Sequence, residues 1–219
     1  MPLAHCSSGA VAIAGSAGGI SALMQLLSGL PANFTLPIFV AQHLARQGTS
    51  ILPKLLNHRG MLRAKWAEQN EIPQAGLIYL VPPAHDLTVT SRGMRLSKLS
   101  PPAAAWLSVA DTLLHSVANV YRDGAIGVVL SGMIPVGLRG LRAIRHAGGL
   151  SFAQSVESSA HSKMPEAAID FGKADLIFSP ARIAEALEIV GKQRANPTAP
   201  HEMADQGAGR AFAVSEYIP

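Results

Sequence analysis

The stretch Val11-Ala12-Ile13-Ala14-Gly15-Ser16-Ala17-Gly18-Gly19-Ile20 decides the fold class of this chain. Its first four residues are small or apolar, which predicts a short buried strand, and the glycine-rich turn then breaks that strand. From Ile20 onward apolar residues recur at helical spacing, so a helix follows at once. Ser16 is therefore expected at the carboxyl edge of a sheet, facing a helix N-terminus, where free backbone N–H groups favour an anion.

The chemistry of Ser16 stays open on this stretch alone. A serine at such a turn is a nucleophile, a helix cap or a hydroxyl that contacts phosphate. A dinucleotide site is disfavoured, because Gly15 and Gly18 are three residues apart and Ala17 stands where the G-x-G-x-x-G motif has its second glycine.

Size and charge restrict the class of protein. The 219 residues fit one α/β domain, and 48% of them are hydrophobic, which allows a sizeable core. The formal net charge is +4 at pH 7 and the pI is about 9.5. The basic residues are scattered, as on a solvated face, with two loose groups at Arg59, Arg63 and Lys65 and at Arg139, Arg142 and Arg145. Aromatic residues make up only 5%, too few to stack on bases, so we expect no nucleic-acid partner.

The sequence also indicates a compartment. The single cysteine, Cys6, excludes an intramolecular disulfide and favours a reducing environment. We identify no signal peptide, and the longest apolar run, at 126–138, is interrupted by glycines and Pro135, so we expect no membrane insertion. These features predict a cytoplasmic protein, and no motif indicates a metal or another cofactor.

Apolar runs alternate with helical patterns along the chain. Besides the first strand, strands are predicted at 37–41, 77–81, 126–130, 150–153 and 176–178, and a hairpin at 87–96. This order predicts a doubly wound, mostly parallel sheet with helices on both faces and a β-hairpin at one edge, a Rossmann-like three-layer α/β fold. We expect a lead-in at 1–10, one domain at 11–190 and a flexible tail at 191–219, since the tail has no core-forming periodicity.

Three short segments follow predicted strands directly. They are Ser16, His43 and Ser131-Gly132-Met133. Because the carboxyl ends of parallel strands form one edge of a sheet, where ligands bind in such folds, we expect these residues to form a site. For His43 the alternative is a hydrogen-bonded loop histidine, and for Met133 it is core packing.

These segments resemble the catalytic domain of the CheB family, the chemotaxis receptor methylesterases, over residues 11–190. The similar motifs are Gly15-Ser16-Ala17-Gly18-Gly19, Ala41-Gln42-His43, Ser108-Val109-Ala110-Asp111, Val129-Leu130-Ser131-Gly132-Met133, Arg145-His146-Ala147-Gly148-Gly149, Ala153-Gln154-Ser155-Val156-Glu157 and Met164-Pro165-Glu166-Ala167-Ala168. The resemblance implies hydrolysis of methyl esters on receptor glutamates, and deamidation of selected receptor glutamines, by a serine, a histidine and an aspartate. It gives Ser16 the role of nucleophile and His43 that of general base, with Ala17, Gly18 and Met133 as active-site neighbours.

The chain departs from the family at the third catalytic position. The family's pattern is Gly-Met-x-x-Asp-Gly, whereas residues 132–137 read Gly-Met-Ile-Pro-Val-Gly, so Val136 stands where the family has aspartate. Valine neither accepts a hydrogen bond from imidazole nor stabilises imidazolium, and loss of this member alone costs serine hydrolases on the order of 10⁴ in turnover. A second departure is Ala84-His85-Asp86, where the family commonly has Asp-x-His.

We therefore expect a protein-glutamate methylesterase whose activity is impaired. The alternative is a non-catalytic binding module that recognises a chemoreceptor or an adaptor partner. Glu157 follows a strand at the same edge as His43, and we consider it as a substitute carboxylate against the alternative of a solvated loop glutamate. Founding members of the family carry an N-terminal receiver domain, for which ten preceding residues leave no room, so we expect a stand-alone domain whose receiver partner, if it has one, acts in trans. The sequence does not indicate an oligomeric state.

Overall fold

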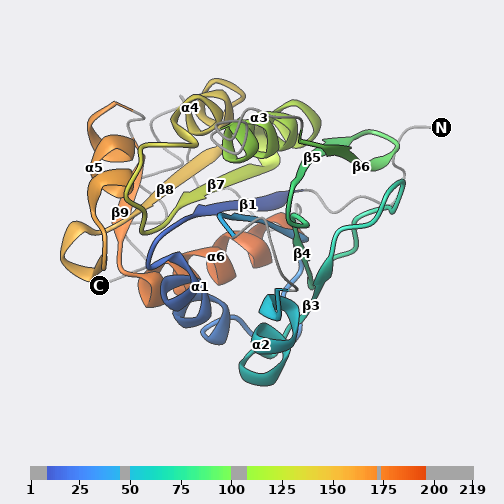
Figure 1. Ribbon diagram of the computed structural model, residues 1–219, viewed down its shortest axis with the longest axis horizontal. Coiled ribbons are helices and arrows are strands. Elements are labelled where there is room, and N and C mark those ends of the chain that lie inside the picture. The colour runs from blue at the N-terminus through green and yellow to red at the C-terminus, as the bar shows by residue number, and fades with distance from the viewer. Residues whose placement is uncertain (1–8, 45–49, 100–107, 172–173, 196–219) are drawn as a thin grey trace.

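The computed structural model describes residues 9–44, 50–99, 108–171 and 174–195. They form a three-layer α/β structure around a seven-stranded sheet in the order β3-β4-β2-β1-β7-β8-β9, in which every neighbouring pair is parallel (Figure 1). The strands are β1 (Ala10–Gly15), β2 (Ile38–Gln42), β3 (Arg63–Trp66), β4 (Leu77–Leu80), β7 (Ala125–Val129), β8 (Leu150–Gln154) and β9 (Leu176–Phe178). The predicted doubly wound, parallel fold class is confirmed.

Helices cover both faces of the sheet. One face carries α1 (Gly19–Ser28), α2 (Leu52–Arg59) and α6 (Pro180–Ala195), and the other carries α3 (Val109–Tyr121), α4 (Leu138–His146) and α5 (Lys163–Asp170). Figure 1 shows α3 and α4 along one side of the strands and α1 and α2 along the opposite side. Two 3₁₀ turns, η2 (Arg122–Gly124) and η3 (Val156–Ser158), complete the described elements. No helix among the described residues is long and apolar enough to span a membrane.

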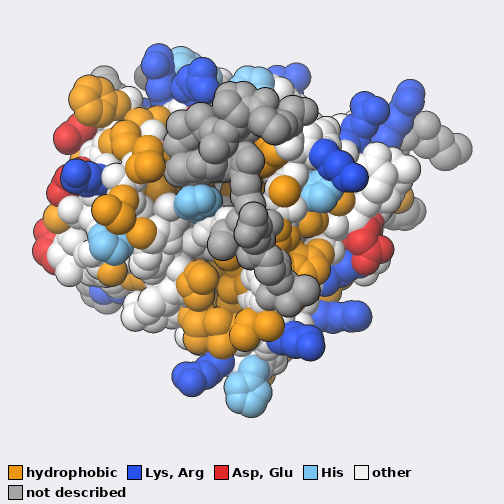
Figure 2. Space-filling model, viewed as in Figure 1, with side chains coloured by type: hydrophobic (Ala, Val, Ile, Leu, Met, Phe, Trp, Pro, Cys, Tyr) orange, Lys and Arg blue, Asp and Glu red, His pale blue; other side chains and the backbone are white. Residues whose placement is uncertain are grey.

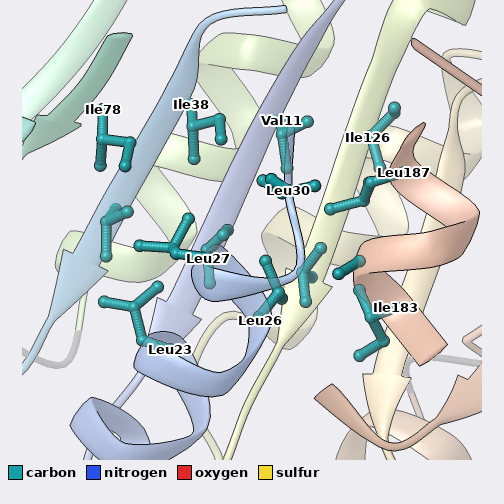
Figure 3. Packing of buried hydrophobic residues seen from close by; sticks show 14 of the residues in the cluster. Val11, Leu23, Leu26, Leu27, Leu30, Ile38, Ile78, Ile126, Ile183 and Leu187 are labelled. Atoms are coloured by element: carbon teal, nitrogen blue, oxygen red, sulfur yellow. The ribbon is translucent and has the colours of Figure 1, made fainter. Parts of the chain in front are cut away.

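Side chains of β1 alternate between two cores. Val11 and Ile13 point toward α1 and α6, where they pack with the leucines of α1 and with Ile183 and Leu187 of α6 (Figure 3). Ala10, Ala12 and Ala14 point to the opposite face, toward α3 and α4. All six residues of β1 are buried, as the predicted central strand requires.

Close packing of α3 against α4 fixes the start of α4. Gly140 has no room for a side chain, since a Cβ there would lie 2.5 Å from the Cβ of Leu114. Its N–H donates to the Asp111 carboxylate at 2.8 Å, so a side chain of α3 satisfies a free N–H in the first turn of α4. The loop that precedes α4 is therefore held against α3.

The connections after β1 and β7 diverge. After β1 the chain enters α1 on one face of the sheet, and after the neighbouring β7 it enters α4 on the other face. Such a divergence opens a crevice at the carboxyl edge of a parallel sheet. Ser16 and the segment from Ser131 to Val136 stand at the two sides of this crevice.

The hairpin is present but is a separate sheet. β5 (His85–Thr90) and β6 (Gly93–Lys98) pair only with each other in the described part of the chain. The hairpin packs on α3, where the N–H of Val89 donates to the buried hydroxyl of Ser116 at 3.0 Å. The prediction of a hairpin is confirmed, and its two strands form a sheet of their own.

The sequence analysis missed β3. Arg63 and Lys65 were assigned to a solvated basic group, yet they belong to the edge strand Arg63–Trp66. Charged side chains are ordinary on edge strands, because they discourage pairing with a further strand. Lys65 is also paired rather than free, at 2.8 Å from Glu68 and 3.0 Å from Glu71. Across the face in Figure 2, Lys and Arg side chains are dispersed rather than gathered in one patch.

The last helix runs further than predicted. The expected end was near Val190, but α6 continues to Ala195. Gly191 is buried, and its carbonyl accepts a hydrogen bond from the Thr35 hydroxyl at 2.9 Å. Arg194 donates to the carbonyl of Asp123 at 2.9 Å and to that of Gly124. The predicted flexible tail can therefore begin no earlier than 196, and residues 196–219 lie outside the described residues, as do residues 1–8 of the predicted lead-in.

We expect Arg194→Ala to destabilise the domain, because two backbone carbonyls lose a charged donor. The expected loss is about 1–2 kcal/mol, which lowers Tm by roughly 3–6 °C in a domain of this size. Lys192→Ala is the matched control on the same helix, since it removes only an exposed ion pair with Glu188. Thermal melts monitored by circular dichroism distinguish the two variants. Equal melting temperatures for them would show that the end of α6 adds nothing to stability.

Candidate active site

The turn after β1, residues 15–19, is held from below by the loop after β7. Ser16 follows the last residue of β1, and its N–H donates to the carbonyl of Ser131 at 2.9 Å. Ser16 is 9% exposed, so its hydroxyl lies at the floor of the crevice. Gly18 has a left-handed conformation with φ of 75°, and a Cβ there would lie 2.6 Å from the Ser131 hydroxyl. Glycine is thus required for the chain to turn into α1 over Ser131.

The structure brings His43 to Ser16, as the strand ends predict. His43 follows β2, and its N–H donates to the carbonyl of Gly15 at 3.0 Å. The Ser16 hydroxyl lies 3.4 Å from Nδ1 of His43. Which atom donates depends on the tautomer, and with an unprotonated Nδ1 the hydroxyl donates to the ring. A long contact of this kind is usual for a catalytic pair without bound substrate.

The electrostatics of His43 suit a general base. His43 is exposed, and the partial loss of water around its side chain lowers the pKa of His43 below its ordinary value. A lowered pKa leaves the imidazole neutral at pH 7, the form that accepts a proton. The hydrogen bond of His43 is thus to Ser16, and its role as a base rather than a hydrogen-bonded loop histidine stays a prediction.

Two backbone N–H groups of the turn are available to an oxyanion. The N–H of Ser16 is bonded to Ser131, and that of Gly19 donates to the carbonyl of Ser16 at 2.9 Å. Within the described residues no hydrogen bond occupies the N–H groups of Ala17 and Gly18. Free N–H groups beside a nucleophilic hydroxyl stabilise a developing oxyanion, worth roughly 10²–10³ in rate for each donor.

A groove of about 460 Å³ lies over the hydroxyl of Ser16. It is lined by Ser16 to Gly18 of the turn after β1, by Gln42 and His43, and by Met133 and Ile134. Met133 is 55% exposed and Ile134 is 43% exposed, so the core-packing alternative for Met133 is wrong. The groove joins a polar pair to an apolar wall, which fits a side chain with an aliphatic stem and a small ester or amide end.

Val136 lies beside His43 in a second, smaller cavity. It is 7% exposed and belongs to the core under α3 and α4. Together with His43, Val81 and Ala110 it lines a cavity of about 60 Å³. None of the described residues that line this cavity is Asp or Glu. The position of the missing aspartate therefore lines the same cavity as His43, and it is apolar.

The shuffled segment at 84–86 supplies no carboxylate to the same cavity. His85 lines it, with Nδ1 bonded to the carbonyl of Pro83 at 2.8 Å. Asp86 is directed to α3 instead, where burial raises the pKa of its carboxyl against the opposing effect of a hydrogen bond with Thr112. Glu157 lies exposed on η3, and no hydrogen bond or ion pair joins it to His43 within the described ranges.

Three polar side chains support the turn: Ser131, which was expected at the site, and Gln42 and Gln154, which were not predicted as site residues. The Ser131 hydroxyl donates to the carbonyl of Ala17 at 2.8 Å and accepts from the N–H of His161 at 2.9 Å. Gln154 accepts from the N–H of Ser131 at 2.8 Å, and Gln42 donates to the carbonyl of Ser16 at 2.8 Å. The signal in the sequence is a polar residue at the end of a buried strand, since both glutamines end β8 and β2.

Comparison with known proteins gives this geometry a context. The chain is 36% identical over 180 residues to "Protein-glutamate methylesterase/protein-glutamine glutaminase 3" of Anaeromyxobacter dehalogenans (strain 2CP-C), which covers 82% of this chain and 53% of that protein. It is 32% identical to "Protein-glutamate methylesterase/protein-glutamine glutaminase of group 3 operon" of Rhizobium meliloti (strain 1021), over 90% of this chain and 55% of that protein. The chain thus spans about half the length of these curated relatives.

A solved structure also resembles this chain in fold. The crystal structure of the Thermotoga maritima CheB methylesterase catalytic domain superimposes with a TM-score of 0.73 at 27% identity, covering 83% of this chain and 98% of that one. The family model described as CheB methylesterase matches residues 11–187, from the first residues of β1 into α6. Since the family model covers most of the chain and the relatives and the solved fold agree with it, the chain belongs to the CheB methylesterase family.

Proposed function

We propose that this protein is a protein-glutamate methylesterase that acts on methylated chemoreceptors through Ser16 and His43. The observation that carries the proposal is the 3.4 Å contact between the Ser16 hydroxyl and Nδ1 of His43 at the crevice of a CheB-type domain. A serine hydroxyl is a weak nucleophile at neutral pH and needs a base within reach. The lowered pKa of His43 supports its role as that base.

The proposed reaction has two halves. The Ser16 hydroxyl attacks the ester carbonyl as its proton passes to His43, and the resulting oxyanion lies near the N–H groups of Ala17 and Gly18. Collapse breaks the bond to the methoxy oxygen, which takes the proton from His43 and leaves as methanol. Water then attacks the glutamyl-serine ester, its proton passing through His43 to the Ser16 oxygen, and free glutamate is released. With a glutamine side chain the leaving group is ammonia, so the same atoms support receptor deamidation.

We propose that Val136 impairs this reaction without abolishing it. An imidazolium forms in both halves, and the apolar cavity at Val136 offers it no carboxylate. Loss of the third member costs on the order of 10⁴ in turnover in serine hydrolases, but a serine–histidine pair and an oxyanion hole retain catalysis over water. Glu157 has no role in this proposal, because its carboxylate is exposed on η3 and unpaired with His43.

The apolar cavity at Val136 also favours a second candidate function. A chain without the third catalytic member serves as a non-catalytic module that recognises a chemoreceptor or an adaptor partner, and a receiver domain in trans is a partner of the same kind. In either case we propose that the protein acts in the cytoplasm, the compartment that its single cysteine favours.

We expect wild-type protein to release methanol from methylated receptor, and Ser16→Ala to reduce the rate to background. The nucleophile is also expected to react with a fluorophosphonate, located at Ser16 by peptide mapping. The two proteins are compared at equal concentration after circular dichroism has shown both to be folded. Methanol release that is the same with Ser16→Ala, or label found only on other residues, would exclude the hydrolase and leave the binding module.

We expect Val136→Asp to raise esterase activity about ten- to a thousandfold. The new carboxylate faces the cavity that His43 lines, so it can orient the ring and stabilise the imidazolium. The upper limit of recovery is roughly 5 kcal/mol, the value of 10⁴ in rate, and the fixed φ of Pro135 works against it. Val136→Asn is the control of equal size without charge. An aspartate variant that is folded and no faster than Val136→Asn would show that the third position is not used.

We expect the acid limb of the kcat/KM profile to lie below about pH 6.5 in the wild type. His43 must be neutral to accept the serine proton, and its pKa is lowered, so activity is lost only as pH falls through that lowered value. In Val136→Asp the limb is expected to move up, because a neighbouring carboxylate favours imidazolium. The measurement is initial methanol release between pH 4.5 and pH 8, roughly the range over which histidine titrates. A wild-type limb above pH 7 would contradict this electrostatic description of His43.

A further inference from the structure

The side chain of Gln42 joins the turn after β1, at Ser16, to the backbone of His43. It is the last residue of β2 and lies opposite Gly15 in the parallel register. Its Nε2 donates to the carbonyl of Ser16 at 2.8 Å and to the carbonyl of His43 at 3.2 Å. Both acceptors are carbonyl oxygens, so only the NH₂ end of the carboxamide satisfies them, and the orientation of the amide is fixed by its partners.

Two glycines leave room for Oε1, the carbonyl oxygen of the Gln42 carboxamide. A Cβ added at Gly15 would lie 2.7 Å from Oε1 of Gln42, and one added at Gly19 would lie 2.6 Å from it. Neither residue has a positive φ, so the glycines are not required by the backbone conformation. They leave the room that the Gln42 carboxamide occupies, between the end of β1 and the start of α1.

The contact to Ser16 acts on the neighbouring N–H. The carbonyl of Ser16 and the N–H of Ala17 belong to one planar trans peptide group and point in opposite directions. Two donors, Nε2 of Gln42 and the N–H of Gly19, hold that carbonyl at 2.8 and 2.9 Å. The N–H of Ala17 is thereby directed to the opposite side, and Ala17 lines the groove above Ser16.

We propose that Gln42 is a positioning residue, which aims the N–H of Ala17 at the oxyanion and sets the spacing of Ser16 and His43. The inference rests on the proposed function for its substrate and on the groove for its geometry. The hydrogen bonds of Gln42 go to the backbone carbonyls of Ser16 and His43 rather than to the Ser16 hydroxyl or the His43 ring. It acts through the peptide group between Ser16 and Ala17, and it also polarises that group by donating to its carbonyl.

The test is the rate at which a fluorophosphonate labels Ser16, together with kcat and KM for methanol release. Gln42→Met keeps the length of the side chain and loses both donated hydrogen bonds, so we expect labelling and kcat to fall about 10- to 100-fold, approaching the loss of one oxyanion donor. KM is expected to stay within about threefold, because the effect arises in the transition state. The final stoichiometry of label is expected to equal that of the wild type, since the protein remains folded.

The control residue is another side-chain carboxamide that forms hydrogen bonds with backbone groups, but outside the groove. Asn57 of α2 donates to the carbonyl of Ala64 at 2.9 Å and accepts from its N–H at 2.7 Å, remote from the groove. Asn57→Ala is expected to lower Tm and to leave the labelling rate unchanged. Equal labelling rates for Gln42→Met and wild type, or equal losses in Gln42→Met and Asn57→Ala, would overturn the assignment.

A double-mutant cycle tests the role of Gln42 in a second way that does not depend on Gln42→Met. Gly19→Ala introduces a Cβ where Oε1 of Gln42 lies, and it is expected to slow labelling by displacing that amide. Gln42→Ala removes the amide that the new Cβ would displace, so Gly19→Ala should then have no further effect. The double variant Gly19→Ala with Gln42→Ala is therefore expected to be labelled no more slowly than Gln42→Ala alone. Additive losses would show that Gly19 acts by another route and would count against the inference. Gln42→Glu, which keeps the shape without the donors, replaces Gln42→Met if that variant does not fold.

The two readouts separate this inference from the proposed function. A wild type that is labelled at Ser16 but releases no methanol would overturn the methylesterase proposal, and the labelling rates would still decide the role of Gln42. A wild type that releases methanol while Gln42→Met and Gln42→Glu both keep its rate would overturn the inference alone.

Discussion

The hydrogen bond from the N–H of Ser16 to the carbonyl of Ser131 is the interaction on which the site depends. It joins the turn after β1 to the loop after β7 at the point where the two connections leave for opposite faces of the sheet. It continues the pairing of β1 with β7 by one bond beyond the N–H of Leu130, which donates to the carbonyl of Ala14 at 2.8 Å. Gly18 bends over Ser131 just above this bond, and the Ser131 hydroxyl then holds the carbonyl of Ala17. The nucleophile thus gains its position from backbone contacts rather than from its own side chain.

Small residues make this arrangement possible. The alanines of β1 that face α3 and α4, and the glycine at position 140, let the two helices approach the sheet and each other closely. The approach leaves Val136 packed against α3 and beside His43, where the site has an apolar cavity of about 60 Å³. Gln42, His43 and His85 also line this cavity, but none of the described residues in its lining is Asp or Glu, so none of them places a carboxylate there. The chemistry of the third position is therefore set by one side chain.

Much of the fold could be predicted from the chain itself, because buried parallel strands are continuous apolar runs. Six of the seven strands of the main sheet were predicted in this way, whereas β3 was missed because its alternating charged residues are typical of an edge. The end of α6 was missed because helical pattern weakens at Gly191, although tertiary contacts of Arg194 extend the helix. The Ser16–His43 pair was predicted because strand ends share an edge. The role of Gln42 could not be, since its partners depend on the register of β1 and β2 and on two glycines far from it in the sequence.

The two sides of the crevice belong to different packing units, and this has a consequence for how such a protein can change. Ser16 and His43 are carried by the adjacent strands β1 and β2, which are locked together by the bond from the N–H of His43 to the carbonyl of Gly15. Val136 is carried by a segment that enters α4, whose start is tied to α3 by Asp111. Substitutions in the core under α3 and α4 can therefore change the residue at position 136 and its surroundings, while the distance between Ser16 and His43 stays the same. A lineage could lose or regain the strength of the proposed catalysis by substitutions on the α3 side of the sheet, without any change in the strands that carry Ser16 and His43.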